Sequence, residues 1–342
     1  MFLYIFLFSL PIILYFLKKY INGGINTKTH DLNGQFIIIT GSSSGIGKES
    51  AFDLLKSNGR VIFACRNEEK AKKAMKEIPE NLKKNAEFLE LDLCNFDSII
   101  TFSNKIKKDY PKIDILMNNA GGHPRLNLGL TKDNYENSFQ GNYIGPFLLT
   151  ILLIPHMNIK GRIINVSSIA HQFVNFDENI IKIMDNYEEI KKKYLTGKYF
   201  DSLNLYSIEK CFMMYFTSYF KDIFENKNID LKIVSLHPGS VITDFARFVD
   251  DYSILYYGLK IFFPLISFIS KNPFQGAQTQ LFLSYVDYNE LINGAYYADC
   301  KLKEQGEISK NEKLKKIVIN WSIQGLKERL KDNDLVQQLS LI

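Results

Sequence analysis

Short apolar runs alternate with longer amphipathic segments along most of this chain, and the alternation limits the fold more than any other feature of the sequence. Runs rich in β-branched residues predict strands at residues 36–40, 60–65, 87–91, 113–117, 162–167 and 231–236. Helical patterns fill the intervals at residues 46–57, 67–78, 96–108, 131–155 and 203–225. Because most strand runs are continuously apolar, we expect helices on both faces of a parallel sheet. The sequence therefore predicts an α/β fold with a doubly wound sheet, whose ligand lies at the carboxyl ends of the strands.

The length of 342 residues fits one large domain with additions at both ends. We expect this domain to span residues 36–300, after a polar linker at 20–35 and before a helical extension at 301–342. Residues 174–202 are polar and rich in lysine, which predicts a surface insertion with a short helix. Residues 251–269 are apolar but interrupted by a lysine and a proline, which favours a segment that covers a substrate or dips into a membrane.

Charge and cysteine content exclude several classes of function. The formal net charge is +5 without any block of like charge, so nucleic-acid binding has little support. The four cysteines lie far apart and include no C-x-x-C pair, so neither a structural zinc site nor a disulfide framework is expected. The chain is predicted to work in a reducing compartment without a metal ion.

The first 17 residues carry no charge and are followed at once by Lys18 and Lys19. As a helix they would measure about 25 Å, at the short end of what crosses a hydrocarbon core of about 30 Å. A cleaved signal peptide is disfavoured because no basic residue precedes the run and the first alanine is Ala51. We therefore expect residues 1–19 to be an uncleaved membrane anchor, and the lysines place the rest of the chain in the cytosol. Burial of this helix on the protein's own surface remains the alternative.

A glycine-rich turn follows the first predicted strand and opens the first predicted helix. It reads Thr40-Gly41-Ser42-Ser43-Ser44-Gly45-Ile46-Gly47. Such a turn lets the backbone approach a pyrophosphate, which the helix N-terminus stabilises, as in Rossmann dinucleotide-binding folds. The residues expected to hold the cofactor here are Gly41, Ser43, Ser44, Gly45, Ile46 and Gly47. The spacing differs from the commonest dinucleotide fingerprint, so the loop alone leaves a plain Ser/Gly turn open.

The ends of the following strands carry further motifs: Asp92-Leu93 after the third and Asn118-Asn119-Ala120-Gly121 after the fourth. With the glycine loop, these motifs resemble the short-chain dehydrogenase/reductase family in order and kind, over roughly residues 33–300. The resemblance implies that Asp92, beside Leu93, contacts the adenine of a dinucleotide. It also implies that Asn119, Ala120 and Gly121 line the adenosine ribose.

Cofactor choice is expected to depend on Arg66, at the end of the second strand. An acidic residue there would bind the ribose 2′-hydroxyl of NAD, whereas a basic residue accommodates the 2′-phosphate of NADP. The sequence therefore favours NADP(H). An ordinary solvated arginine at a helix start is the alternative.

Two Tyr-x-x-x-Lys pairs could supply the proton that carbonyl reduction requires, Tyr194–Lys198 and Tyr206–Lys210. A tyrosine with an ordinary pKa of about 10 needs a nearby cation to act near neutral pH, and a lysine one helical turn away supplies it. The first pair includes a glycine in a polar stretch, whereas the second begins a long amphipathic helix. We therefore expect Tyr206 to be the general acid/base and Lys210 to lower its pKa and bind the nicotinamide ribose.

The resemblance implies three further site positions. Ser168 corresponds to the family's substrate-orienting hydroxyl, with Ser167 as the close alternative, and Asn142 to the asparagine that supports a water chain to the lysine. After the sixth strand, His237-Pro238-Gly239-Ser240-Val241-Ile242-Thr243 resembles the family's Pro-Gly motif. There Pro238, Gly239, Val241 and Thr243 would meet the nicotinamide and the phosphates, and His237 is expected to be structural.

Within the family the chain looks most like the retinol dehydrogenase branch, on segments such as Ser167-Ser168-Ile169-Ala170-His171 and Asn293-Gly294-Ala295-Tyr296-Tyr297. That resemblance implies a membrane-anchored, NADP(H)-linked enzyme for lipophilic alcohols, aldehydes or ketones, on the endoplasmic reticulum with its catalytic domain in the cytosol. A steroid or lipid-keto reductase of the same fold and a non-catalytic nucleotide-binding scaffold are the alternatives. The sequence leaves a homodimer open.

Overall fold

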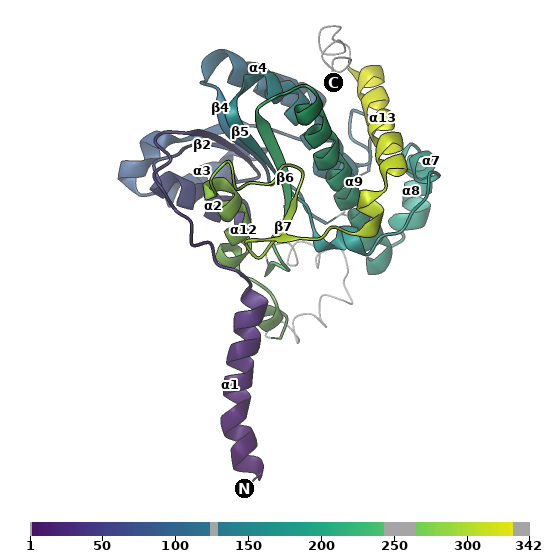
Figure 1. Cartoon of the computed structure of the whole chain (residues 1–342). Coiled ribbons are helices and arrows are strands. Elements are labelled where there is room, and N and C mark those ends of the chain that lie inside the picture. The colour runs from purple at the N-terminus through teal and green to yellow at the C-terminus, as the bar shows by residue number, and fades with distance from the viewer. Residues whose placement is uncertain (1, 124–128, 243–264, 331–342) are drawn as a thin grey trace.

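Eight strands form one sheet in the order β3-β2-β1-β4-β5-β6-β7-β8 (Figure 1). The computed structural model describes residues 2–123, 129–242 and 265–330. The strands are β1 (Phe36–Thr40), β2 (Arg60–Cys65), β3 (Ala86–Glu90), β4 (Ile113–Asn118), β5 (Met157–Val166), β6 (Leu231–His237), β7 (Tyr296–Ala298) and β8 (Lys301–Lys303). The first seven pair in parallel, and only β8 runs antiparallel to its neighbour. The predicted doubly wound sheet is confirmed, and the order reverses between β1 and β4, where such folds bind their ligands.

Alternate strand residues point into two separate apolar layers. Ile38, Ile62 and Leu116 face one layer, which also holds apolar residues of α4 (Phe96–Asp109), α6 (Gly145–Leu153) and α9 (Tyr199–Asn226). Residues at the intervening positions, such as Ile37, Phe63 and Met117, face the other layer. That layer is closed by α2 (Gly45–Lys56), α3 (Glu68–Lys76) and α12 (Pro273–Tyr285). Burial on both faces explains why these strands are continuously apolar in sequence.

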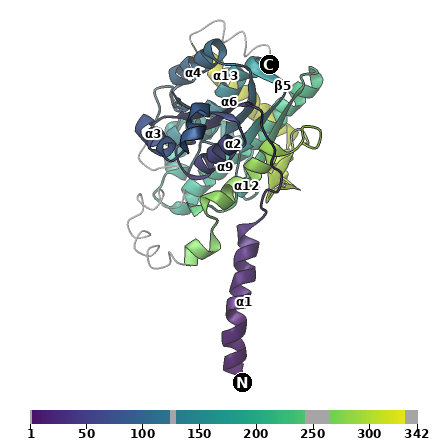
Figure 2. The ribbon, with the colours of Figure 1, turned by 90° about the vertical axis from the view of Figure 1, so that its left-hand side faces the viewer.

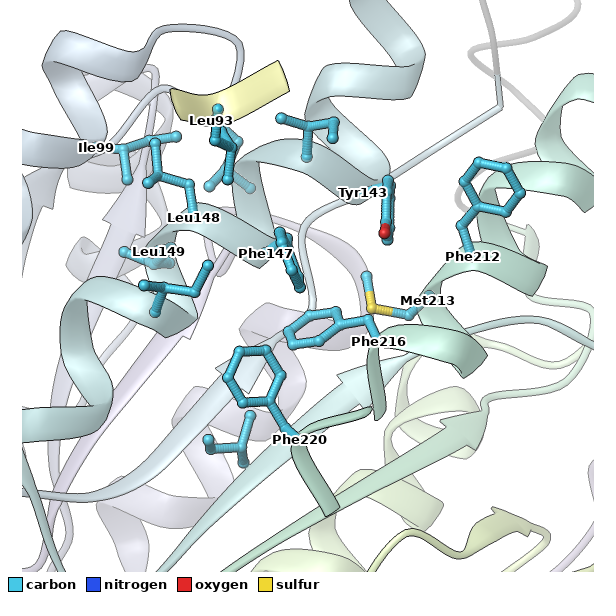
Figure 3. Packing of buried hydrophobic residues seen from close by; sticks show 14 of the residues in the cluster. Leu93, Ile99, Tyr143, Phe147, Leu148, Leu149, Phe212, Met213, Phe216 and Phe220 are labelled. Carbon is cyan, nitrogen blue, oxygen red and sulfur yellow. The ribbon is translucent and has the colours of Figure 1, made fainter. Parts of the chain in front are cut away.

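Aromatic rings that meet edge to face fix α9 against the π-helical turn η2 (Gln140–Ile144) and α6 (Figure 3). Phe147 meets Phe216 edge to face with ring centroids 5.3 Å apart, and Tyr143 meets Phe212 in the same way at 5.3 Å. Edge-to-face pairs of buried rings contribute about 0.5–1.5 kcal/mol each beyond the area they bury. The turn of α9 that carries Tyr206 and Lys210 therefore stands on a rigid support.

The prediction of one continuous helix over residues 131–155 is wrong for the first half of that range. The chain instead forms α5 (Asn137–Phe139), a π-helical turn η2 (Gln140–Ile144), α6 and the 3₁₀ turn η3 (Ile154–His156). Asn134 has a φ of 61°, which breaks any helix at that point. The Glu136 carboxylate then accepts a hydrogen bond from the amide of Phe139 at 2.7 Å and starts the helix there.

The segment at residues 174–202 is only partly the polar surface excursion that its composition predicted. It forms two helices, α7 (Ile180–Met184) and α8 (Tyr187–Tyr194), rather than one. Their apolar residues Ile180, Met184 and Ile190 are buried in the layer that contains α9. The lysines hid this pattern, because they occupy the outer faces of helices whose inner faces are apolar at helical spacing.

The C-terminal region is also more than a helical extension. Residues 301–303 form the edge strand β8 rather than a helix, and the 3₁₀ turn η5 (Glu307–Lys310) leads into α13 (Glu312–Arg329). Leu314, Val318 and Leu326 of α13 are buried in the same apolar layer as α9. The remaining short elements are the 3₁₀ turns η1 (Glu80–Asn85) and η4 (Ile169–Gln172).

The N-terminal helix α1 (Phe2–Asn22) stands away from the rest of the chain (Figures 1 and 2). Its apolar side chains Ile12, Ile13 and Phe16 are exposed. Lys18 joins it to the segment before α12, since its ammonium donates to the carbonyls of Phe268 and Ser270 at 2.8 Å each. Within the residues that the structure describes, no helix combines the length and the apolar character needed to cross a membrane. Most of the apolar run at 251–269 lies outside the described residues.

Candidate active site

A cavity of about 450 Å³ opens where the carboxyl ends of the central strands meet. Its wall follows the strand ends in spatial order, from Asp92 after β3 to Arg66 after β2, Gly41 after β1 and Gly121 after β4. Of the residues predicted from sequence, the cavity is lined by Gly41, Ser43, Ser44, Gly45, Ile46, Arg66, Asp92, Leu93, Asn119, Ala120, Gly121, Asn142, Tyr206, Lys210 and Pro238. Motifs spread over 198 positions of sequence, from 41 to 238, thus meet at one site.

The glycine loop has no room for side chains at two of its positions. Gly41 has a φ of +68°, and a Cβ atom there would lie 2.9 Å from the Cα of Ala120. A Cβ atom at Gly47 would lie 2.4 Å from the side-chain nitrogen of Asn119. These two glycines therefore let the loop pack closely against the Asn-Asn-Ala-Gly motif. The N-terminus of α2 follows at the cavity wall, where it would stabilise an anionic diphosphate.

Thr40 ties this loop to the Asn-Asn-Ala-Gly motif. Its hydroxyl oxygen accepts from the amides of Asn119 at 3.0 Å and Ala120 at 2.8 Å. Its carbonyl accepts from the side-chain amide of Asn119 at 2.8 Å. The first asparagine has a different role, because Asn118 is buried and donates to Asn165 of β5 at 2.8 Å. One asparagine thus joins strands while the other shapes the cavity.

Two cationic side chains line the end of the cavity beside β2, Arg66 and Lys70. Asn67 begins α3 between them, and its side-chain oxygen accepts from the amide of Lys70 at 2.8 Å. The sequence did not indicate Lys70, because Arg66 lies before the N-cap of α3 and the two residues therefore share no helical face. Asp92 forms the adjacent wall, where its carboxylate accepts from the amide of Cys94 at 2.9 Å.

Tyr206 and Lys210 lie one turn apart on α9, and both line the cavity. The ammonium of Lys210 lies 5.5 Å from the centroid of the Tyr206 ring and donates to the carbonyl of Val166 at 2.9 Å. His123, which sequence reasoning also missed, stacks on Tyr206 with ring centroids 5.7 Å apart. The phenol therefore lies between an aromatic ring and a buried cation.

The competing pair does not share this arrangement. Tyr194 ends α8 and is buried in the apolar core, where burial raises the pKa of its phenol to about 12. Lys198 is exposed and caps the next helix, so the two residues belong to different elements. Neither residue lines the cavity described above. The geometry selects Tyr206 and Lys210.

The two adjacent serines have different surroundings. Ser167 is buried, and its hydroxyl donates to the carbonyl of Lys210 at 3.0 Å, which ties β5 to α9. Ser168 is half-buried, and its hydroxyl oxygen accepts from the amide of Ala170 at 3.2 Å. Accepting that bond leaves the hydroxyl hydrogen of Ser168 for a substrate oxygen. Of the two serines, Ser167 lines the cavity and Ser168 does not.

A buried histidine, His171, and a half-buried one, His237, hold the backbone around these serines. His171 contacts the carbonyl of Ser168 through Nδ1 and accepts from the amide of Gly306 through Nε2 at 3.1 Å, so Nδ1 carries its proton. His237 accepts from the amides of Ile169 and Gly239 through Nδ1. Burial lowers the pKa of His237 to about 4, so this ring is neutral. The structural role expected for His237 agrees with these contacts.

Asn142 lies in the π-helical turn η2 and closes the cavity beside Lys210. Its side chain exchanges two hydrogen bonds with Gly122, accepting from the amide at 2.9 Å and donating to the carbonyl at 2.7 Å. Its amide also donates to the buried carboxylate of Glu209 at 2.6 Å. Nothing in the sequence indicated this contact, because the Tyr-x-x-x-Lys motif assigns no partner to the acid at position 209.

Three residues that were predicted to bind the cofactor, Gly47, Gly239 and Val241, do not line the cavity. Gly239, with a φ of +97°, packs on the Lys271 side chain, and Val241 pairs with Lys271 in an isolated bridge. Gly47, the last residue of the glycine loop, lies against Asn119, as described above. Thr243 lies outside the described residues.

Comparison with known proteins gives consistent matches. Residues 35–178 match the protein family described as short chain dehydrogenase. Retinol dehydrogenase 11 of Mus musculus is 31% identical over 321 residues, covering 91% of this chain and 94% of the relative. Retinol dehydrogenase 13 of Mus musculus is 30% identical over 301 residues, covering 87% and 85%.

Solved structures share the fold. A putative uncharacterized protein from Mycobacterium paratuberculosis matches with a TM-score of 0.66 at 21% identity, over 88% of this chain and 96% of that one. A short chain dehydrogenase from Shigella flexneri, solved in complex with NADP, matches with a TM-score of 0.56 at 20% identity, over 80% and 100%.

Proposed function

Since the chain belongs to the short-chain dehydrogenase/reductase family and is an oxidoreductase of alcohol and carbonyl groups, we propose a more specific reaction. We propose that the enzyme interconverts a lipophilic alcohol and its aldehyde or ketone with NADP(H). The observation that carries the proposal is one continuous cavity. It is lined by Tyr206 and Lys210, by Arg66 and Lys70, and by the glycine loop.

The residues present fit a nicotinamide dinucleotide. The cavity of about 450 Å³ falls within the range of ligand pockets, about 300–1,000 Å³. Its middle is the glycine loop, where a Cβ atom at Gly41 would strike Ala120 and the N-terminus of α2 favours phosphate. When bound, the nicotinamide supplies the hydride for carbonyl reduction or accepts it in alcohol oxidation.

The protein's own side chains would move the proton. In reduction, the phenol of Tyr206 donates its proton to the oxygen of the former carbonyl, and in oxidation the same oxygen takes it back. Lys210 lies one turn away and favours the phenolate that remains. Ser168 orients the substrate oxygen, and Asn142 fixes the wall beside Lys210.

Preference for NADP(H) over NAD(H) is proposed from Arg66 and Lys70. Both cations line the cavity beside β2, where a 2′-phosphate would lie. The Shigella flexneri relative was solved with NADP, which supports the same choice. Two cations on one phosphate form charge-assisted hydrogen bonds, which are about twice as strong as neutral ones.

Replacing Arg66 by alanine tests cofactor choice. Arg66→Ala is expected to weaken NADPH binding by about 10–100-fold and to leave NADH binding nearly unchanged, because only NADPH carries the lost phosphate contact. Titration of each cofactor against native and variant protein measures both constants. Equal weakening of NADPH and NADH would instead mean that Arg66 only supports the fold, and native protein that prefers NADH would reject the NADP(H) assignment.

A lipophilic substrate and a membrane location are proposed together. The relatives named retinol dehydrogenase act on an alcohol that is poorly soluble in water, and α1 presents Ile12, Ile13 and Phe16 to its surroundings. Residues 1–19 would hold the enzyme at a membrane where such a substrate is concentrated. The endoplasmic reticulum, with the catalytic domain in the cytosol, is the location we propose.

Removal of residues 1–19 tests this location. The shortened protein is expected to leave the membrane fraction while keeping its kcat on a short, water-soluble aldehyde, because neither Lys18 nor Lys19 lines the cavity that holds Tyr206 and Lys210. Fractionation and turnover of both proteins are the measurements. Full-length protein found free of membranes would overturn the assignment.

A further inference from the structure

Glu209 is a fully buried acid that none of the roles above uses. It directly precedes Lys210 on α9, and none of its surface is exposed. A buried carboxyl group is costly unless it is hydrogen-bonded or paired. The cost of burying this acid beside the proposed catalytic lysine therefore suggests that Glu209 has a role at the site.

The carboxyl group of Glu209 has two short contacts. One oxygen accepts from the side-chain amide of Asn142 at 2.6 Å, and the other accepts from the hydroxyl of Ser138 at 2.6 Å. Both donors line the cavity from the segment around the π-helical turn η2. Glu209 thus lies directly behind the cavity wall and holds two of its residues.

Asn142 transmits this contact to the backbone after β4. Its amide and carbonyl groups each bond to Gly122, at 2.7 and 2.9 Å. At the adjacent Gly121, a Cβ atom would lie 2.8 Å from the Asn142 side-chain oxygen and 3.3 Å from the ammonium of Lys210. Asn142 and Lys210 therefore approach the same point of the wall, and the position of one limits the other.

The protonation state of Glu209 determines which substituted side chain can reproduce its hydrogen bonds. Burial and, next, the charge of Glu136 raise the pKa of Glu209 well above the usual carboxyl range, while its contacts with Ser138, Asn142 and Lys210 oppose this. Glu136 is itself buried, and burial raises its pKa as well. The charge of Glu136 thus disfavours the charged form of Glu209. A neutral glutamine at position 209 can still accept from Asn142 and donate to Ser138, whereas leucine can do neither.

We propose that Glu209 is a positioning residue for the reaction. It holds the side chain of Asn142, and through it the Gly121–Gly122 backbone, at the distance from Lys210 that proton transfer through Tyr206 requires. The inference rests on the proposed function for its effect on turnover. A displacement of about 1 Å in such an arrangement costs about 100-fold in rate.

Three variants separate positioning from general packing. Glu209→Leu is expected to lower kcat for NADPH-dependent carbonyl reduction by about 100-fold, with little change in the NADPH dissociation constant. Glu209→Gln is expected to restore kcat to within about threefold of native, because both hydrogen bonds can re-form. Glu136→Gln is the matched control, since it removes a neighbouring buried acid that does not contact Asn142, and its kcat is expected to stay near native.

Amide hydrogen exchange at Gly122 gives a readout that needs no turnover. Its amide donates to Asn142, so exchange is expected to accelerate in Glu209→Leu and to stay slow in Glu209→Gln and the native protein.

Two results would overturn the inference. One is slow exchange together with native kcat in folded Glu209→Leu, and the other is a Glu209→Gln variant that is as inactive as the leucine variant. If Glu209→Leu fails to fold, the activity and exchange of Glu209→Gln decide. Native protein that turns over no carbonyl rejects the proposed function, and the exchange rates then still test the contact.

Discussion

Replacing Tyr206 by phenylalanine is expected to lower kcat for NADPH-dependent carbonyl reduction by about 10²–10⁴-fold. The change removes one hydroxyl and keeps the ring that stacks on His123. Without the phenol, the proposed proton donor to the oxygen of the substrate is lost, so the alkoxide that hydride transfer forms is not neutralised by Tyr206. The NADPH dissociation constant is expected to stay near native, because the phosphate loop is untouched. Steady-state kinetics and cofactor titration measure the two effects.

The second Tyr-x-x-x-Lys pair offers a matched control. Tyr194→Phe also removes one phenol hydroxyl, but from a side chain buried in the core and away from the cavity. Its kcat is expected to remain near native. Equal activity in Tyr206→Phe and Tyr194→Phe would mean that the proton comes from another group.

The glycine loop gives the second large effect. Gly47→Ala is expected to weaken binding of either cofactor by about 10–100-fold, which corresponds to the usual cost of overpacking, about 1–3 kcal/mol. The new methyl group would lie 2.4 Å from the Asn119 side chain and 2.9 Å from the Gly41 carbonyl. Asn119 cannot turn away without losing its bond to Thr40. The loop must therefore move toward the space that the diphosphate would fill.

Lys56→Ala provides the control for this variant, since Lys56 is exposed on the last turn of the same helix. Calorimetric titration with NADPH and NADH compares the two variants. If Gly47→Ala binds both cofactors as tightly as Lys56→Ala does, the cavity beside the loop is not the dinucleotide site.

The central strands could be predicted because burial on both faces leaves a continuous apolar run. β1 and β2 begin and end where the sequence indicated. β7 has only three residues, Tyr296–Ala298, which is too short for a period-two or apolar pattern to emerge. β8, Lys301–Lys303, is exposed throughout and is defined only by its pairing with β7.

The helix errors have a similar cause. A π-helical turn and a tight turn at Asn134 leave the apolar spacing of residues 131–155 almost unchanged, so the pattern did not reveal the break. In α7 and α8, lysines on the outer faces concealed the apolar residues that reach the core.

The candidate site could be predicted where its chemistry depends on short sequence motifs, and not where it depends on tertiary contacts. Tyr206 and Lys210 are separated by one helical turn, and the long amphipathic pattern that follows them distinguished this pair from Tyr194 and Lys198. Glu209 bonds to Asn142, 67 residues earlier, and only the fold brings them together. Lys70 could not be predicted either, because Arg66 lies before the N-cap of α3 and only the fold brings both side chains to the cavity.

Transfer of isotope from cofactor to product tests the central claim most directly. Native protein is incubated with NADPH that carries deuterium on the transferable position of nicotinamide C4, and with a panel of lipophilic aldehydes and ketones. We expect at least one carbonyl compound to yield its alcohol with one deuterium on the carbinol carbon, and Tyr206→Phe to form almost none. Native protein that binds NADPH but forms no labelled alcohol from any member of the panel would contradict the account.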